Sequence, residues 1–111
     1  MIFMSLKMQE ELEQAVKVLS RSVMPQKIYL FGSHAKSSAN GESDIDLCII
    51  TETMGKRKND IIREARKAIS SVLETPMDLL VYDLDEFSEL ARLNTTFEHK
   101  ILQEGILLYE Q

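Results

Sequence analysis

Residues 44–50, Asp-Ile-Asp-Leu-Cys-Ile-Ile, put two carboxylates at the head of an apolar run. A run of this composition is typical of a buried strand, in which side chains alternate between the two faces of the sheet. Asp44 and Asp46 therefore share one face and are close neighbours. Two carboxylates about 4 Å apart repel by roughly 4 kcal/mol at an effective dielectric constant of about 20. A fold that contains this strand must offset the repulsion, either by keeping one acid protonated or by placing a cation between them.

A third acid, Asp78, lies in another predicted strand, Met-Asp-Leu-Leu-Val-Tyr-Asp at residues 77–83, which follows Pro76. If this strand runs beside residues 44–50, Asp78 reaches the same patch and three acids converge at one end of the sheet. Ligands that are all oxygen favour a hard cation such as Mg²⁺. The acid pair taken alone is also compatible with solvated residues that form a turn at the start of a strand.

Gly32 and Ser33 follow a predicted strand at residues 27–31 and precede a predicted loop at residues 37–43. A glycine followed by a small hydroxyl residue lets backbone N–H groups approach a phosphate closely, and the Ser33 hydroxyl adds a further hydrogen bond. A phosphate-binding turn next to a metal-binding acid cluster is suited to phosphoryl or nucleotidyl transfer.

Apolar residues at spacings of three and four, together with local capping signals, predict the remaining elements. These are helices at residues 5–22 with Ser5 as the N-cap, at 59–73 and at 85–92, a helix with a Thr95 and Glu98 capping box that ends at Gly105, and an edge strand in Ile-Leu-Leu-Tyr at 106–109. Strands interleaved with helices predict one α+β domain over residues 1–111, a small mixed sheet with the helices packed on one side.

Composition narrows the function classes. A net charge of -5 argues against general affinity for nucleic acid, because that affinity depends on Lys and Arg displacing counterions. The single cysteine, Cys48, cannot form an internal disulfide and is interpreted as a small buried hydrophobe. There is no signal-peptide core and no apolar run long enough to span a membrane, so the expected location is the cytoplasm. His99 is interpreted as a solvated surface residue, and residues 55–60 as a solvated loop and helix start.

The combined motif of Gly32-Ser33, ten intervening residues, Asp44-Ile45-Asp46 and the later Asp78 resembles the signature of the DNA polymerase beta-like nucleotidyltransferase superfamily. The short chain and its ending at residues 101–110, Ile-Leu-Gln-Glu-Gly-Ile-Leu-Leu-Tyr-Glu, are similar to the minimal nucleotidyltransferases, or MNT-domain proteins. These are bacterial and archaeal antitoxins that are often encoded beside a HEPN-domain partner. The resemblance implies the palm-type α+β fold of that superfamily.

The resemblance also implies residue roles. The incoming nucleoside triphosphate would be held by Gly32, Ser33, Lys36 and Ser43, and two Mg²⁺ ions by Asp44, Asp46 and Asp78. Asp78 would also help to activate the acceptor hydroxyl. The implied reaction moves AMP from ATP to a tyrosine of a HEPN-type toxin and silences its RNase activity. The chain would then be a Mg²⁺-dependent protein adenylyltransferase and an antitoxin.

Two departures from the family pattern keep other functions open. His34 stands where an Arg is common, and Ser37 stands where a Gly is common. A neutral histidine neutralises phosphate charge less well than an arginine, and losing the glycine removes easy access to positive φ. One alternative is therefore a catalytically weak module that neutralises its partner by occlusion. Another is transfer to a small-molecule hydroxyl, as in the aminoglycoside nucleotidyltransferases, which a chain this short would support only as an oligomer. A homodimer and a hetero-oligomer are both compatible with the sequence.

Overall fold

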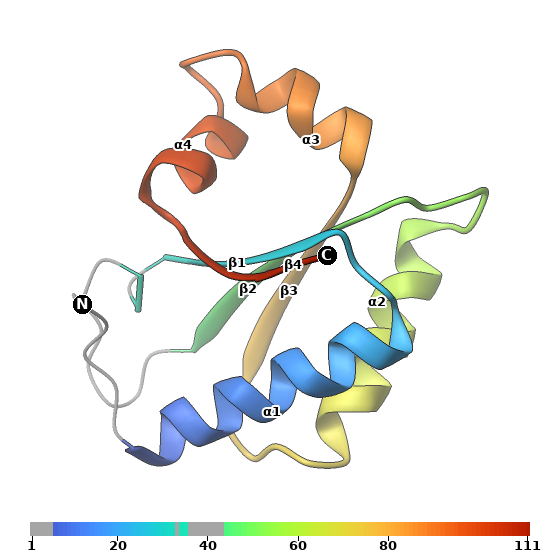
Figure 1. The fold of residues 1–111 in the computed structure, drawn as a ribbon, viewed down its shortest axis with the longest axis vertical. Helices are drawn as coiled ribbons and strands as arrows, with labels where there is room; N and C mark the ends of the chain where they lie inside the picture. The colour runs from blue at the N-terminus through green and yellow to red at the C-terminus, as the bar shows by residue number, and fades with distance from the viewer. Residues whose placement is uncertain (1–5, 33, 36–43) are drawn as a thin grey trace.

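The computed structural model of the chain describes residues 6–32, 34–35 and 44–111. They form a four-stranded mixed sheet with helices on both faces (Figure 1). The elements in chain order are α1 (Leu6–Ser22), β1 (Lys27–Phe31), β2 (Ile45–Thr51), α2 (Lys58–Ser70), β3 (Met77–Asp83), α3 (Leu84–Ala91), α4 (Phe97–Glu104) and β4 (Ile106–Glu110). The predicted N-cap Ser5 and the predicted loop at 37–43 lie outside the described residues.

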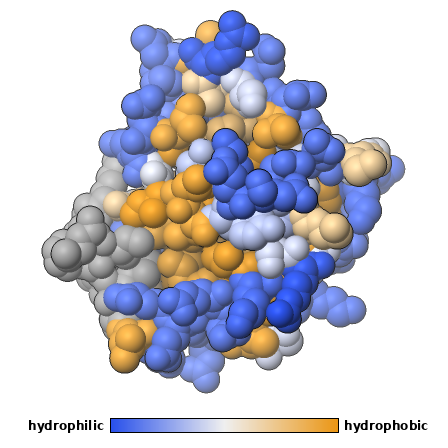
Figure 2. Space-filling view, in the orientation of Figure 1, coloured by the Kyte–Doolittle hydropathy of each residue, from blue (hydrophilic) through white to orange (hydrophobic). Residues whose placement is uncertain are grey.

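The sheet has the strand order β3-β2-β1-β4. β2 runs parallel to β3, and α2 provides the crossover that parallel neighbours require. β1 runs antiparallel to both β2 and β4. The predicted proximity of residues 44–50 and 77–83 is confirmed, and so is the position of the last strand at a sheet edge. Apolar side chains gather over that edge between more hydrophilic helical surfaces (Figure 2), and Leu107 of β4 is exposed there.

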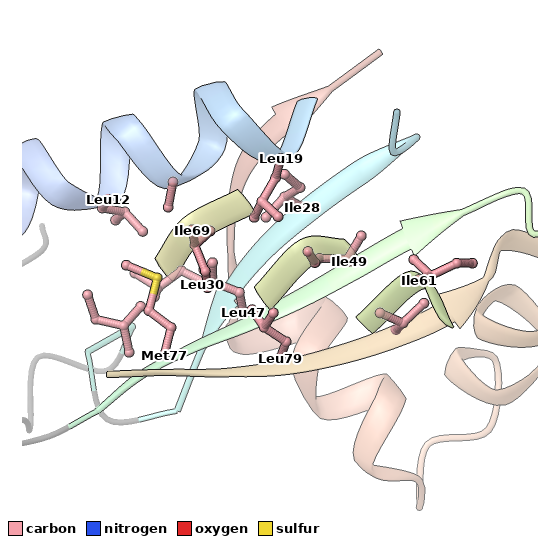
Figure 3. Close-up of a cluster of buried hydrophobic side chains, with 14 residues drawn as sticks. Leu12, Leu19, Ile28, Leu30, Leu47, Ile49, Ile61, Ile69, Met77 and Leu79 are labelled. Carbon is pink, nitrogen blue, oxygen red and sulfur yellow. The ribbon is translucent and has the colours of Figure 1, made fainter. Parts of the chain in front are cut away.

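Helices cover both faces of the sheet, so the prediction that they pack on one side is wrong (Figure 1). The larger core lies between the sheet and the layer of α1 and α2 and includes Leu19, Leu47 and Ile69 (Figure 3). The smaller core lies under α3 and α4 and includes Cys48 and Phe87. A central strand such as β2 is apolar at almost every position because both of its faces must be covered.

Two predictions at α4 are also wrong. The N-cap is Thr96 instead of Thr95, and its hydroxyl oxygen accepts a hydrogen bond from the His99 backbone N–H at 3.0 Å. The His99 ring is half-buried, and its Nδ1 donates to the Ala91 carbonyl at 2.8 Å, which ties α4 to the end of α3. The predicted C-cap at Gly105 is confirmed, since its backbone N–H donates to the Ile101 carbonyl at 2.7 Å.

Other interpretations from the sequence are confirmed. Cys48 is fully buried, and burial together with the charge of Glu98 raises the pKa of its thiol to about 12. Residues 55–60 are exposed, and α2 begins among them at Lys58. Within the parts of the chain that the structure describes, no helix is both long and apolar enough to cross a membrane.

A buried carboxylate joins α1 to the turn before β3. Glu11 is only 8% exposed, and it accepts hydrogen bonds from the backbone N–H groups of Glu74 at 2.8 Å and Thr75 at 3.1 Å, and from the Thr75 hydroxyl. The hydroxyl bond is the main reason why the pKa of Glu11 lies below its ordinary value. This turn sets where β3 begins, and therefore where Asp78 lies.

We expect Glu11→Gln to lower the free energy of unfolding at pH 7 by about 1–3 kcal/mol, because hydrogen bonds to a buried charged acceptor are weakened. The carboxylate pKa is lowered in the folded state, so this contribution is present above the unfolded-state pKa and is lost as the pH falls through the folded-state value. Urea unfolding of both proteins at neutral and acidic pH measures the difference. Glu13→Gln, on the exposed side of the same helix, is the control, and equal midpoints at pH 7 would contradict the assignment.

Candidate active site

One end of the sheet brings three of the predicted site residues together. β1 ends at Phe31, which pairs with Asp46 in the antiparallel register, and Gly32 follows it directly. In the parallel register, Asp46 of β2 lies beside Asp78 of β3. Asp46 is half-buried, whereas Asp44 and Asp78 are exposed. Because strand side chains alternate, Asp46 and Asp78 lie on the face that α3 and α4 partly cover.

The two aspartates interact as like charges. Burial raises the pKa of the Asp46 carboxyl, and the charge of Asp78, a hydrogen bond with Asp78 and the charge of Asp44 raise it further. The His34 imidazole acts in the opposite direction. Asp44 therefore repels the Asp46 carboxylate, as the sequence predicts. Asp78 on the neighbouring strand raises the pKa of Asp46 more than Asp44 does.

Gly32 packs directly against Asp46. Its φ is +77°, in the left-handed region that favours glycine, and a Cβ at this position would lie 2.3 Å from Oδ2 of Asp46. The position therefore requires glycine both for its backbone conformation and for the space that Asp46 occupies. The absence of a side chain lets the backbone at Gly32 come close to Asp46.

His34 is a feature that the sequence analysis missed in part. The sequence places His34 near phosphate. In the structure its side chain is only 2% exposed, and its charge lowers the pKa of Asp46. Among the predicted nucleotide-binding residues, Ser33, Lys36 and Ser43 lie outside the described residues, as does Ser37. Their roles stay predictions.

The acids fit a hard cation in chemistry, since their donor atoms are all oxygen and their mutual repulsion favours a positive charge between them. Asp46 and Asp78 are paired in the parallel register, and the charge of Asp44 also acts on Asp46. Within residues 6–32, 34–35 and 44–111, no group of three or more His, Cys, Asp or Glu side chains is placed to hold a metal ion. The metal-binding roles of the three aspartates therefore stay a prediction.

A hollow of about 150 Å³ adjoins Gly32 on the side of α4. The rings of Phe31 and Phe97 meet edge to face in its wall, with centroids 5.7 Å apart, and Lys100 and Glu104 of α4 also line it. Phe97 is 50% exposed. α4 thus forms one wall of a hollow beside Gly32, a feature that local sequence patterns did not indicate.

Comparison with known proteins gives a family and a fold. The family model described as Polymerase beta, Nucleotidyltransferase matches residues 13–111. A candidate nucleotidyltransferase from Sulfolobus solfataricus is similar in structure, with a TM-score of 0.55 and 16% sequence identity, over 98% of this chain and 91% of that chain. In the search of curated proteins, no sequence match was significant.

Two toxin–antitoxin structures are also similar to the chain. One contains AMP-PNP and matches with a TM-score of 0.58 and 23% identity, over 89% of this chain and 73% of that chain. The other is a mutant of the MntA-HpeT complex and matches with a TM-score of 0.59 and 20% identity, over 89% of this chain and 72% of that chain. At these identities the likeness shows a shared fold.

We expect Gly32→Ala to destabilise the protein more than Gly55→Ala. Both glycines have positive φ, which costs an alanine about 1–2 kcal/mol, but a Cβ at Gly55 would meet nothing within 4 Å, whereas one at Gly32 would meet Asp46. Thermal unfolding measures both effects. Adding Asp46→Ala to Gly32→Ala should restore part of the difference, and equal losses in the two single variants would contradict the packing argument.

Asp46→Asn should raise the melting temperature by a few degrees at neutral pH in the presence of a chelator. The pKa of Asp46 is raised, so the wild type is more stable with this group protonated, and that stability is lost as the pH rises through the folded-state pKa. The gain from Asn should therefore shrink as the pH is lowered. Asp60→Asn on the exposed surface of α2 is the control, and a lower melting temperature for Asp46→Asn would contradict this account.

Proposed function

The chain belongs to the polymerase beta nucleotidyltransferase family, and we propose that it is a Mg²⁺-dependent enzyme that transfers AMP from ATP to a hydroxyl group of a partner protein. The observation that supports this most directly is the pairing of Asp46 with Asp78 in the parallel register of β2 and β3, with Gly32 packed against Asp46. Two acids of like charge lie beside a glycine whose backbone comes close to one of them. A cation and a phosphate would complete such a site.

The carboxylate oxygens of Asp44, Asp46 and Asp78 would hold the metal ions. Bound there, Mg²⁺ would neutralise charge and stabilise the attacking and leaving oxygens of an in-line displacement at the α-phosphorus, with release of pyrophosphate. Gly32 would let backbone N–H groups approach the triphosphate, with Ser33, Lys36 and Ser43 as further contacts. Asp78, which is exposed at the start of β3, would orient the acceptor hydroxyl.

The proposed acceptor is a hydroxyl carried by another protein. Asp44 and Asp78 face solvent, so a group presented by a second chain can reach them. The structural likeness to toxin–antitoxin complexes, one of them holding AMP-PNP, supports a HEPN-type toxin as that chain and an antitoxin role for this one. The resulting assembly would be a hetero-oligomer.

Two observations favour a second candidate, neutralisation of the partner by occlusion without efficient chemistry. The described part of the chain holds no trio of metal-ligating side chains, and the buried His34 is not an exposed phosphate-binding cation. In that case the surface around the acids would serve for binding alone.

The test is to incubate the protein with the product of the neighbouring gene, Mg²⁺ and each of the four nucleoside triphosphates, and to measure intact masses. We expect the partner to gain one or more AMP units. The Asp44→Asn, Asp46→Asn double variant should lower the rate by at least about a hundredfold while retaining the fold, because charge stabilisation of the transition state is lost.

Asp60→Asn serves as the matched control, since it removes an exposed carboxylate on α2, away from the acid pair. Retained transfer in the double variant would refute the assigned roles of Asp44 and Asp46. No mass gain, together with a complex that the double variant forms equally well, would favour occlusion.

A further inference from the structure

A carboxylate from α4 lies on the same face of the sheet as the acid pair. The Tyr82 hydroxyl of β3 donates a hydrogen bond to Oε2 of Glu98 at 2.5 Å, and both side chains are half-buried. Glu98 is in the first turn of α4, which lies over this face (Figure 1). The bond fixes the position of the Glu98 carboxylate relative to β3.

Strand periodicity relates this carboxylate to Asp46 and Asp78. Tyr82 is four residues after Asp78 on β3, and Cys48 is two residues after Asp46 on β2, so all four share a face. Glu98 is hydrogen-bonded to Tyr82 on β3, and its charge contributes to the raised pKa of the Cys48 thiol on β2. Cys48 is one side-chain row from Asp46, about 7 Å along the strand.

The position of Gly32 suggests which part of a nucleotide would reach Glu98. Gly32 lies at the end of β1, on one side of Asp46, whereas Tyr82 lies on β3, on the other side and four residues, about 13 Å, past Asp78 along the strand. If the triphosphate extends from the Gly32 turn to the acid pair, as in the proposed function, the nucleoside leaves on the side of β3. The ribose is the first group beyond the α-phosphate on that path.

The chemistry of Glu98 suits hydroxyl groups. An ionised carboxylate only accepts hydrogen bonds and has about four lone-pair sites, of which Tyr82 uses one. A ribose offers two O–H donors. We propose that Glu98 binds the ribose hydroxyls of the nucleotide and selects ribonucleotides over deoxyribonucleotides, with Tyr82 as its positioning residue. This inference rests on the proposed function and identifies a substrate feature that the site would read.

A purely structural role for the pair makes a different prediction. If the Tyr82 and Glu98 bond only holds α4 against the sheet, its loss would weaken the binding of every nucleotide by the same factor. If Glu98 contacts the ribose, its loss would weaken only nucleotides that carry the hydroxyl it binds. The ratio of two affinities therefore separates the roles, whereas stability alone would not.

The experiment is isothermal titration of the full chain with ATP, 2′-deoxy-ATP and 3′-deoxy-ATP in the presence of Mg²⁺. We expect the wild type to bind ATP at least about tenfold more tightly than one or both deoxy analogues, a value typical of a hydrogen bond to a charged group. Glu98→Gln should weaken the binding of ATP. It should leave almost unchanged the affinity for the deoxy analogue that lacks the hydroxyl bound by Glu98. Tyr82→Phe should also reduce the ratio of the affinity for ATP to the affinity for that analogue, because it frees the Glu98 carboxylate to rotate.

Glu89→Gln on the exposed surface of α3 is the matched control and should keep the wild-type ratio. Equal wild-type affinities for all three nucleotides, or an unchanged ratio in Glu98→Gln, would overturn the inference and leave the proposed function standing. Failure of the wild type to bind any of the nucleotides would instead overturn the proposed function and this inference with it. If the wild type binds only one of the two deoxy analogues more weakly than ATP, the hydroxyl missing from that analogue is the one that Glu98 binds.

Discussion

The parallel pairing of β2 with β3 is the interaction on which the candidate site depends. It places Asp46 beside Asp78, although 31 residues separate them along the chain, and it requires the α2 crossover, which covers one face of the sheet. Shifting the register by one residue would move Asp78 to the opposite face, into the core beneath α1 and α2. The hydrophobic pattern of β3, with Met77 and Leu79 buried, therefore fixes the position of the site as firmly as it fixes the core.

The burial of β2 on both faces explains why Asp46 has the electrostatics it has. From Leu47 to Thr51, every residue of this strand is buried, and Asp46, near the start of the strand, is half-buried. The carboxylate is therefore partly removed from water, and burial contributes more to its raised pKa than either neighbouring acid does. The same core that stabilises the sheet therefore holds the Asp46 carboxylate partly out of water beside Asp78.

Local patterns in the sequence predicted the strands, most helix positions and the shared face of Asp44 and Asp46, because side-chain periodicity is a local property. They did not predict that helices cover both faces, although the continuous apolar run from Leu47 to Ile50 in β2 is typical of a strand that is buried on both sides. They also placed the α4 cap one residue early, because Thr95 and Thr96 are equivalent as local signals and the Thr96 hydroxyl is selected by its further bonds to the carbonyls of Leu90 and Leu93. The burial of His34 and the bond between Tyr82 and Glu98 arise from tertiary packing, which no local spacing encodes.

The arrangement of residues at the acid pair lowers the stability of the unliganded protein. Gly32 gives up the conformational restriction that a side chain would provide, and in return its backbone comes close to Asp46. Partial burial and the charges of Asp78 and Asp44 disfavour the ionised form of Asp46, and the His34 imidazole favours it. Residues that weaken the free protein while converging on one point are more readily explained by a ligand than by folding, because a bound cation reverses the sign of their interaction. The physical argument for a site at this end of the sheet therefore comes from its cost to the unliganded chain, independently of the family to which the chain belongs.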